Sequence, residues 1–325
     1  MRIALSVGIN YYNDTNQCLN SCVDDALTIH RLLSRHEDGS KNFDSQPLVA
    51  ESDASRVNRA PLEARIRKLF DTEADIALLY YAGHGFFDSE GGYLLPSDTV
   101  YGDDGVSLQF VLDAANGSKA KHRVIILDSC YSGAAGESPA LGGLSGLADG
   151  VTVLTSSTKD QVSKEVVGGH GVFTSLLIDA LEGAAANLLG EVTPGSVYAH
   201  IDQSLGAWDQ RPVFKANVKK FASLRQTKPT VDLADLHQMK ELFEAPDYVL
   251  PLTPEYEPAR EGRTDLPPPD PEKTKVFALL QRLVKCNLVR PVGAEHMYYA
   301  ALESKGCELK PLGRYYWRLV ARGRL

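Results

Sequence analysis

The sequence lacks any apolar run long enough to cross a membrane. Its hydrophobic stretches are far shorter than the about 20 residues that a transmembrane helix requires. The opening residues, MRIALSVGINYY, have neither a long apolar core nor a cleavage-like end, which argues against a signal peptide. We therefore expect a cytoplasmic protein with no membrane partner.

Cysteine is also scarce, and its distribution argues against a disulfide framework and against a zinc site. The five cysteines, Cys18, Cys22, Cys130, Cys286 and Cys307, are odd in number and scattered, unlike the dense even sets of secreted scaffolds. Cys18 and Cys22 are spaced like half of a metal site, but no second Cys/His pair stands at zinc-finger distance. The sequence predicts reduced thiols and no structural metal.

Negative charge is in excess overall, but it is unevenly placed. The formal net charge is −8, whereas residues 273–325 hold eleven Lys and Arg against three Asp and Glu, a balance of +8. The remaining 272 residues therefore carry −16. Hydrophobic residues make up 43% of the chain, close to the globular average, so the sequence predicts a folded acidic body with a basic tail.

Apolar runs and amphipathic stretches alternate through the first two-thirds of the chain, which is typical of strands and helices around a mostly parallel sheet. The apolar runs DIALLYY and RVIIL lack alternation, as expected for strands covered on both faces. The sequence predicts an α/β fold with helices on both faces of the sheet. Its expected strands are 2–9, 75–81, 123–127 and 151–155, and its expected helices are 20–36, 62–70 and 172–182.

The stretch 227–272 differs in composition, with eleven Asp and Glu against four Lys and Arg and several prolines. Such a stretch resists packing into a core, so we expect a linker that opens with a helix near 233–243. The predicted domains are thus a large α/β domain over 1–226, this linker, and a small basic α+β domain over 273–325. In the last, we expect helices at 273–284 and 294–304, and the ending LKPLGRYYWRLVARGRL resembles the helix-to-wing finish of winged-helix domains.

Two of the predicted central strands end in residues that belong together chemically. One strand stops at Ala82-Gly83-His84-Gly85, and another stops at Asp128-Ser129-Cys130. Because the carboxyl ends of parallel strands form the crevice where ligands sit, a His and a Cys at two such ends can face one site. A thiol attacks a carbonyl only when a base is near or its pKa is lowered. The sequence predicts Cys130 as a nucleophile and His84 as its base.

The glycines of these motifs fit the same chemistry. Gly83 and Gly85 let the main chain approach a substrate closely. A tetrahedral oxyanion needs preorganised N–H donors, and the backbone amides of Gly85 and Cys130 are the candidates. The prediction is acyl transfer through a covalent acyl-enzyme.

YYAGHG, followed after 46 residues by LDSCYSG, resembles the caspase and metacaspase superfamily of cysteine peptidases, in its prokaryotic (orthocaspase) form. Further blocks along residues 1–220 agree in order: VGINYY, CVDDA, VTVLTSSTKDQVSKE, GVFTSLLIDALEG and DQRPVF. The resemblance implies a caspase-like sheet and a Cys130/His84 pair.

Animal caspases carry a QAC-type motif and bind an aspartate before the cut bond, whereas this chain has DSC. The acidic version resembles metacaspases, in which carboxylates at the positions of Asp25 and Asp128 line a pocket for a basic residue. That resemblance implies cleavage after Arg or Lys, with Arg favoured because its guanidinium binds carboxylates bidentately. Ala82 stands where many metacaspases have a Ser, and Cys22, also placed at the pocket, is expected chiefly to pack against the sheet.

No cofactor is expected, and calcium activation is the one alternative. The acidic cluster that binds calcium in many metacaspases is not reproduced, although Asp98, Asp103 and Asp104 lie in the corresponding stretch.

The sequence therefore favours a regulated cysteine endopeptidase acting on protein substrates, and family analogy suggests a prokaryotic stress or antiviral defence system. The rival class is a catalytically silent scaffold that keeps the fold and binds a protein partner. For the basic C-terminal domain we expect a protein partner, because Arg314 and Arg318 interleave with Tyr315, Tyr316 and Trp317 as at a protein interface. Nucleic acid binding and a purely structural role are the alternatives.

Overall fold

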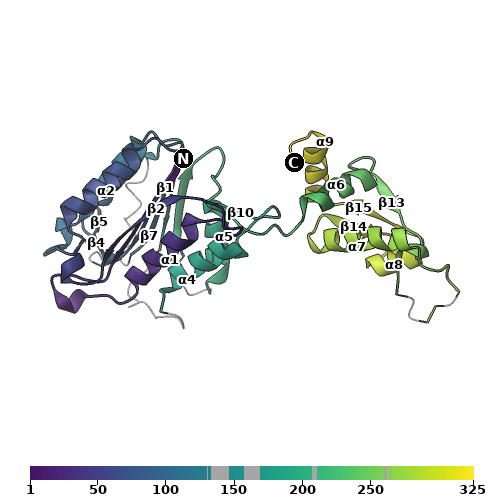
Figure 1. Cartoon of the computed structure of the whole chain (residues 1–325), viewed down its shortest axis with the longest axis horizontal. Helices are drawn as coiled ribbons and strands as arrows, with labels where there is room; N and C mark the ends of the chain where they lie inside the picture. Colours follow the sequence, from purple (N-terminus) through teal and green to yellow (C-terminus); the bar gives the residue numbers. More distant parts are fainter. Residues whose placement is uncertain (130, 133–145, 157–168, 207–210, 260–261, 264) are drawn as a thin grey trace. The chain divides into compact units, whose positions relative to one another are not determined.

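The protein is described by a computed structural model, shown in Figure 1. It describes residues 1–129, 131–132, 146–156, 169–206, 211–259, 262–263 and 265–325. The chain divides into two compact units, Met1–Lys228 and Pro229–Leu325. Within the described residues, no helix is long and apolar enough to cross a bilayer.

The first unit is built on a six-stranded sheet in the order β11-β9-β7-β3-β1-β2. All neighbouring strands run parallel except β11, which pairs antiparallel with β9 at one edge. The central strands are apolar along their length, and every residue of β3 is buried. The strands are β1 (Arg2–Ile9), β2 (Asp44–Ala50), β3 (Ile76–Ala82), β7 (His122–Asp128), β9 (Val151–Thr155) and β11 (Val213–Asn217).

Helices cover both faces of this sheet. Successive side chains of each strand point to opposite faces, so each strand packs against helices on both sides. One face packs its odd-numbered β3 residues, such as Leu79, against α2 (Arg59–Asp71) and α3 (Leu108–Asn116). The other packs residues such as Leu78 against α1 (Cys22–Ser34), α4 (Val172–Asp179) and α5 (Pro194–Ser204). The predicted α/β fold with a mostly parallel sheet and helices on both faces is confirmed.

A smaller sheet, in the order β6-β5-β4-β8, continues from the carboxyl ends of β3 and β7. Its strands are short: β4 (Gly85–Phe87), β5 (Gly92–Leu94), β6 (Val106–Ser107) and β8 (Tyr131–Ser132). Strands β10 (Glu191–Val192) and β12 (Arg225–Gln226) form a separate antiparallel pair. Single helical turns lie at η1 (Thr15–Gln17), η2 (Asp53–Ser55) and η3 (Gly102–Asp104), and a wide turn, η6 (Ala180–Ala184), extends α4. The small sheet therefore lies at the carboxyl ends of the central strands, where His84 and Cys130 were expected.

The second unit contains a three-stranded antiparallel sheet in the order β13-β15-β14. Its strands are β13 (Val249–Pro251), β14 (Val289–Val292) and β15 (Gly306–Leu309), and its helices are α6 (Leu233–Leu242), η7 (Pro254–Tyr256), α7 (Pro271–Lys285), α8 (Met297–Leu302) and α9 (Pro311–Ala321).

The domain boundaries differ from those expected from composition. The stretch 227–272, predicted as a linker, contributes α6, β13 and η7 to the second unit, and the break falls after Lys228 instead. Pro251 ends β13 and Pro254 begins η7, and apolar residues of the stretch, including Leu236, Met239, Phe243 and Leu252, are buried. Composition alone missed these few buried residues.

The expected winged-helix ending also differs from the structure. The last residues form helix α9 rather than a wing hairpin, and α8 lies between β14 and β15. Pro311 occupies the first turn of α9, where a missing N–H is harmless, and Gly313, Tyr316 and Val320 bury one face at helical spacing.

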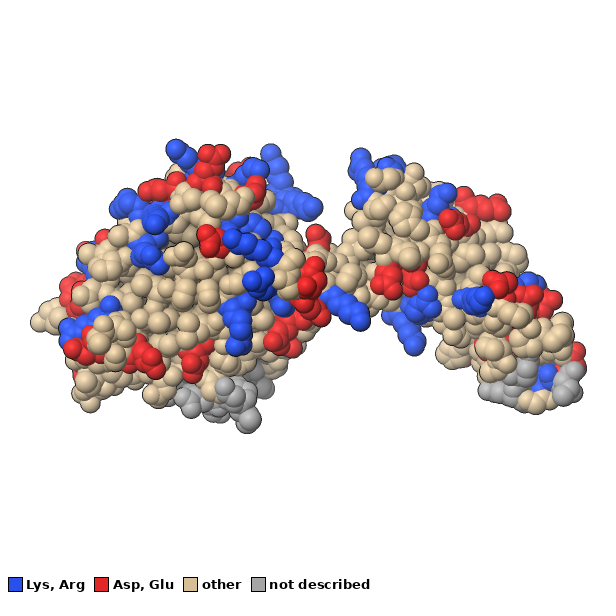
Figure 2. Space-filling view, viewed as in Figure 1, with Lys and Arg blue, Asp and Glu red and all other residues tan. Residues whose placement is uncertain are grey.

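The second unit is also not basic as a whole. Residues 229–272 hold eleven Asp and Glu against three Lys and Arg, which offsets the +8 of residues 273–325. Acidic and basic side chains lie close together on its surface in Figure 2. Arg282 bonds to Asp235 at 2.8 Å, and Lys273 pairs with Glu255. The acidic stretch thus neutralises the basic one inside a single unit.

Candidate active site

His84 follows the carboxyl end of β3, beside β1. The chain runs from β1 outward to β2 and then returns to β3 on the other side of β1, so the strand order reverses there. Ligands of open α/β sheets bind outside the carboxyl ends of the strands at such a reversal. The sequence-predicted base therefore stands where this fold places a ligand.

The imidazole of His84 has a defined hydrogen-bond state. Its Nε2 lies 2.8 Å from the main-chain oxygen of Gln17. A carbonyl oxygen only accepts, so Nε2 carries the proton and Nδ1 keeps its lone pair. Burial also lowers the pKa of His84, although the bond to Gln17 opposes that shift. The residue is thus a neutral imidazole with a basic Nδ1, as a general base must be.

Tyr12 holds the backbone and the ring of His84. The main-chain N–H of His84 donates to the Tyr12 hydroxyl at 2.8 Å, and the two rings lie with centroids 4.8 Å apart. On the same face of the sheet, the Tyr81 hydroxyl shares its proton between the main-chain oxygens of His84 and Leu95, each at 2.9 Å. A Cβ on Gly83 would lie 2.7 Å from the Tyr81 hydroxyl, so a larger residue there would displace Tyr81 from this contact.

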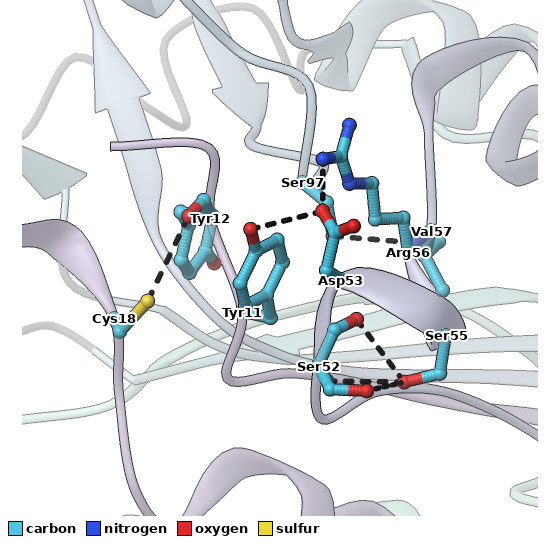
Figure 3. Close-up of polar contacts among 9 residues, drawn as sticks. All are labelled: Tyr11, Tyr12, Cys18, Ser52, Asp53, Ser55, Arg56, Val57 and Ser97. Carbon is cyan, nitrogen blue, oxygen red and sulfur yellow. Dashed lines mark hydrogen bonds and ion pairs between the residues drawn. The ribbon is translucent and has the colours of Figure 1, made fainter. Parts of the chain in front are cut away.

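The loop that carries Tyr12 and Gln17 is itself anchored, as Figure 3 shows. The Tyr11 hydroxyl donates to Asp53 at 3.1 Å, and Asp53 also pairs with Arg56. The main-chain N–H of Leu19 donates to the oxygen of Asn10 at 2.8 Å, which closes the loop. The orientation of the imidazole is therefore set by a loop fixed at several points.

Cys130 lies outside the described residues, but the chain on either side of it is described. Ala82 pairs with Asp128 across β3 and β7, and Gly85 pairs with Tyr131 across β4 and β8. Both pairings are parallel, so the two motifs run side by side from strand to strand. The pairing brings together the segments that contain His84 and Cys130. Gly85, whose N–H was predicted as an oxyanion donor, begins β4 beside the segment that contains Cys130.

Asp128, at the end of β7, is half-buried and hydrogen-bonded. The Thr174 hydroxyl donates to its Oδ2 at 2.6 Å. Because the single proton of Thr174 is used there, the Tyr80 hydroxyl, 2.6 Å from Thr174 Oγ1, must be the donor of that second bond. Burial raises the pKa of Asp128 in spite of these bonds. The carboxylate is thus oriented but has no cation partner among the described residues.

Asp25, on the first turns of α1, lies on the same face of the sheet. Gly8 makes this approach possible, because a Cβ there would lie 2.2 Å from the Cys22 oxygen. The Asp25 side chain is only 3% exposed, and its Oδ1 lies 2.5 Å from Nδ1 of His170. Burial raises the pKa of Asp25 to about 7, the bond to His170 opposes this, and the charge of Asp128 adds to it. The two predicted pocket carboxylates are therefore neighbours.

The other two residues placed at the pocket lie nearby. Ala82 is 1% exposed and packs with the core on the α1 face of the sheet. Cys22 is partly buried and packs against the same core. Packing was the expected role of Cys22, and a contact of either residue with substrate stays a prediction.

Sequence reasoning missed several partners in this site. Tyr12, Gln17, Thr174 and His170 each bond to one of the predicted residues, and His170 had no predicted partner. Tyr80 in turn bonds to Thr174. The motif GHGVFT placed His170 and Thr174 four residues apart, but nothing in it indicated contacts with Asp25 and Asp128.

Two of the three acids considered for calcium accept hydrogen bonds from main-chain N–H groups. Asp98 accepts from the main-chain N–H of Arg59 at the start of α2, and Asp104 accepts from that of Tyr101. Among the residues the structure describes, no three His, Cys, Asp or Glu side chains are grouped as metal ligands would be. Calcium activation thus stays a prediction, and no cluster of metal ligands among the described residues supports it.

Solved structures and a family model match this chain. Among solved structures, the chain is similar to a protein from Geobacter sulfurreducens, with 19% identity and a TM-score of 0.49 over 70% of this chain and 97% of the other. It is also similar to caspase-1 from Spodoptera frugiperda, with 13% identity and a TM-score of 0.48 over 71% of this chain and 91% of the other. No match is found among curated proteins. A sequence model of the caspase domain, a peptidase family, matches residues 1–248, and the chain therefore belongs to the caspase-domain family.

Proposed function

We propose that this protein is a cysteine endopeptidase that cuts protein substrates after basic residues, with Cys130 as nucleophile and His84 as base. The observation that carries the proposal is the state of His84, whose Nε2 is bonded to a main-chain oxygen so that Nδ1 keeps its lone pair. An imidazole fixed in this way, in a chain of a peptidase family, suits proton transfer from a thiol.

The proposed reaction is a two-step acyl transfer. The Cys130 sulfur attacks the scissile carbonyl carbon as its proton passes to His84 Nδ1, and the backbone N–H groups of Gly85 and Cys130 stabilise the oxyanion. The C–N bond breaks, and the leaving amine takes the proton from His84. Water then attacks the thioester, with His84 accepting its proton, and the acid is released as the thiol is regenerated.

The preference for a basic residue is supported by Asp25 and Asp128. Both are neighbours on one face of the sheet, and burial raises the pKa of each. Two desolvated carboxylates favour a cationic guest, since a nearby positive charge offsets the cost of their burial. Arg is proposed over Lys because a guanidinium can bond to two carboxylate oxygens at once.

The test is cleavage of fluorogenic peptides with Arg, Lys, norleucine or Asp before the bond. We expect Arg to be cut fastest, followed by Lys, and Cys130→Ala to abolish the signal. Cys286→Ala is the matched control, because Cys286 lies at the end of α7 in the second unit. Equal signals from wild type and Cys130→Ala would remove the peptidase proposal and favour the silent scaffold.

For the second unit we propose a protein partner or regulator. Its acidic and basic residues balance, with fourteen of each in 229–325, which disfavours the phosphate backbone of a nucleic acid as a ligand. The aromatic Tyr315 is 57% exposed on α9. Deleting residues 229–325 is expected to leave peptide turnover intact and remove recruitment, and loss of peptide turnover would contradict a separate adaptor role. Regulation and a stress or antiviral role stay predictions from family analogy.

A further inference from the structure

His170 is hydrogen-bonded to Asp25, the carboxylate that the proposed function assigns to substrate binding. Its Nδ1 lies 2.5 Å from Asp25 Oδ1, across 145 residues of sequence. The Asp25 side chain is 3% exposed and that of His170 is 25% exposed. The imidazole therefore lies between the Asp25 carboxylate and solvent. A substrate cation cannot reach this carboxylate while His170 is bonded to it.

The segment around His170 also approaches the second carboxylate. A Cβ built on Gly171 would have Asp128 Oδ2 as its nearest neighbour, at 3.7 Å. His170 is flanked by Gly169, whose φ is +85°, and by Gly171. A residue between two glycines can be turned away from its site at little conformational cost, because their backbones have more allowed states than those of other residues.

The charged and titratable groups around Asp25 come from every element packed on it. Asp24 and Cys22 lie on α1, Asp128 on β7 and Tyr80 on β3, and His170 precedes α4. Apart from His170, none of these groups brings a positive charge to the carboxylates. The imidazole is thus the one cation source within this group of described side chains.

We propose that His170 is a displaceable occupant of the basic-residue site, which the Arg or Lys side chain of a substrate must remove from Asp25 in order to bind. This inference rests on the proposed function, whose specificity it refines. It makes His170 a residue that sets specificity: a cation able to bond to both carboxylates replaces the imidazole, whereas an apolar side chain cannot.

A thermodynamic consequence follows. If substrate and imidazole compete for Asp25, then the affinity of the site for a cation is reduced by the population in which His170 occupies it. At a pH well above the raised pKa of Asp25, removing His170 must then tighten binding of the cation. If His170 instead positions Asp25 for the substrate, its removal must weaken binding.

The experiment measures binding of Nα-acetyl-argininamide by calorimetry to the full chain carrying Cys130→Ala, with and without His170→Ala. Near about pH 9, above the raised pKa of Asp25, we expect His170→Ala to bind about tenfold more tightly. Nα-acetyl-norleucinamide, which has no charge, should show no such difference.

Two controls keep the test sharp. His200→Ala removes another imidazole paired with an acid, since His200 Nε2 lies 2.7 Å from Asp179, and it should leave the affinity unchanged. If His170→Ala fails to fold, His170→Asn keeps a hydrogen-bonding side chain without the charge and should also tighten binding. In nitrogen-15 spectra, the imidazole signal of His170 should move when argininamide binds, whereas that of His200 should stay.

Equal or weaker binding by both His170 variants would overturn the proposal, as would a His170 signal that argininamide leaves in place. Absence of argininamide binding in every variant would overturn it together with the pocket assignment. Because the measurement needs no turnover, either result is distinct from failure of the peptidase proposal, which is decided by Cys130-dependent cleavage.

Discussion

His84 and His170 are two imidazoles at the same edge of one sheet, and their partners make them opposites. His84 bonds through Nε2 to the neutral main-chain oxygen of Gln17, and burial lowers its pKa. His170 bonds through Nδ1 to the carboxylate of Asp25. The bond to Gln17 leaves Nδ1 of His84 free to accept a proton, whereas the bond to Asp25 engages Nδ1 of His170. The difference teaches that the partner, more than the residue type, decides whether a histidine nitrogen is available as a base.

The strongest test of this comparison replaces His84. In His84→Ala, we expect kcat/KM for Arg peptides to fall about 1000-fold, because general base catalysis is lost. His170→Ala, assayed in parallel, should change the same quantity by less than about tenfold, through substrate binding. If the two replacements had equal effects on kcat, the imidazoles would not have distinct roles.

The next test removes the charge of Asp128 while keeping its shape. Asp128→Asn should lower kcat/KM for Arg peptides about 100-fold, since a desolvated charge pair with the substrate is lost. The rate at which iodoacetamide alkylates Cys130 should stay the same, because His84 is untouched. Unchanged selectivity for Arg over norleucine would refute the pocket assignment.

Tyr12 offers a smaller effect on the His84 side of the comparison. Tyr12→Phe leaves the buried main-chain N–H of His84 without its acceptor, so the free energy of unfolding should fall by about 1–3 kcal/mol. Urea denaturation measures this change. The matched control is Tyr11→Phe, whose hydroxyl bonds to the exposed Asp53 and whose effect should stay within about 0.5 kcal/mol. Equal effects would show that the Tyr12 hydroxyl does not hold His84.

The smallest effect is a difference between two pH profiles. His84 must be neutral to accept a proton, so alkylation of Cys130 should lose rate only as the pH falls below the ordinary histidine value of about 6.5. Binding of an Arg peptide also needs ionised Asp25, whose pKa is raised to about 7. Hydrolysis of Arg peptides should therefore fall off at a higher pH than alkylation does. Coincident profiles would contradict the assignment of Asp25 to substrate binding.

Much of the fold follows from hydrophobic pattern alone. Strand β1 coincides with the predicted 2–9, and β3 and β7 agree with their predicted ranges within a residue, because buried parallel strands are apolar throughout. Strand β2 was missed, since its sequence DSQPLVA is half-exposed and contains Pro47. The hydrophobic pattern reports burial, so it does not mark strands at the exposed edges of the sheet.

The residues of the site divide in the same way, into those that a sequence pattern marks and those that it does not. His84 was found because it ends a strongly patterned strand, whereas Asp25 and Asp128 were assigned to the pocket by resemblance. Gln17 acts through a main-chain oxygen, which no side-chain motif marks, and His170 meets Asp25 across 145 residues. Such partners depend on tertiary packing, which local sequence does not encode.

Pro47 has a further consequence for the protein in concentrated solution. It lies within β2, at the rim of the large sheet, and has no N–H to offer. Adjacent Gln46 and Asp44 are exposed there as well. A strand from another molecule that tried to extend the sheet past β2 would find an interrupted row of donors and polar side chains, which discourages aggregation at this rim.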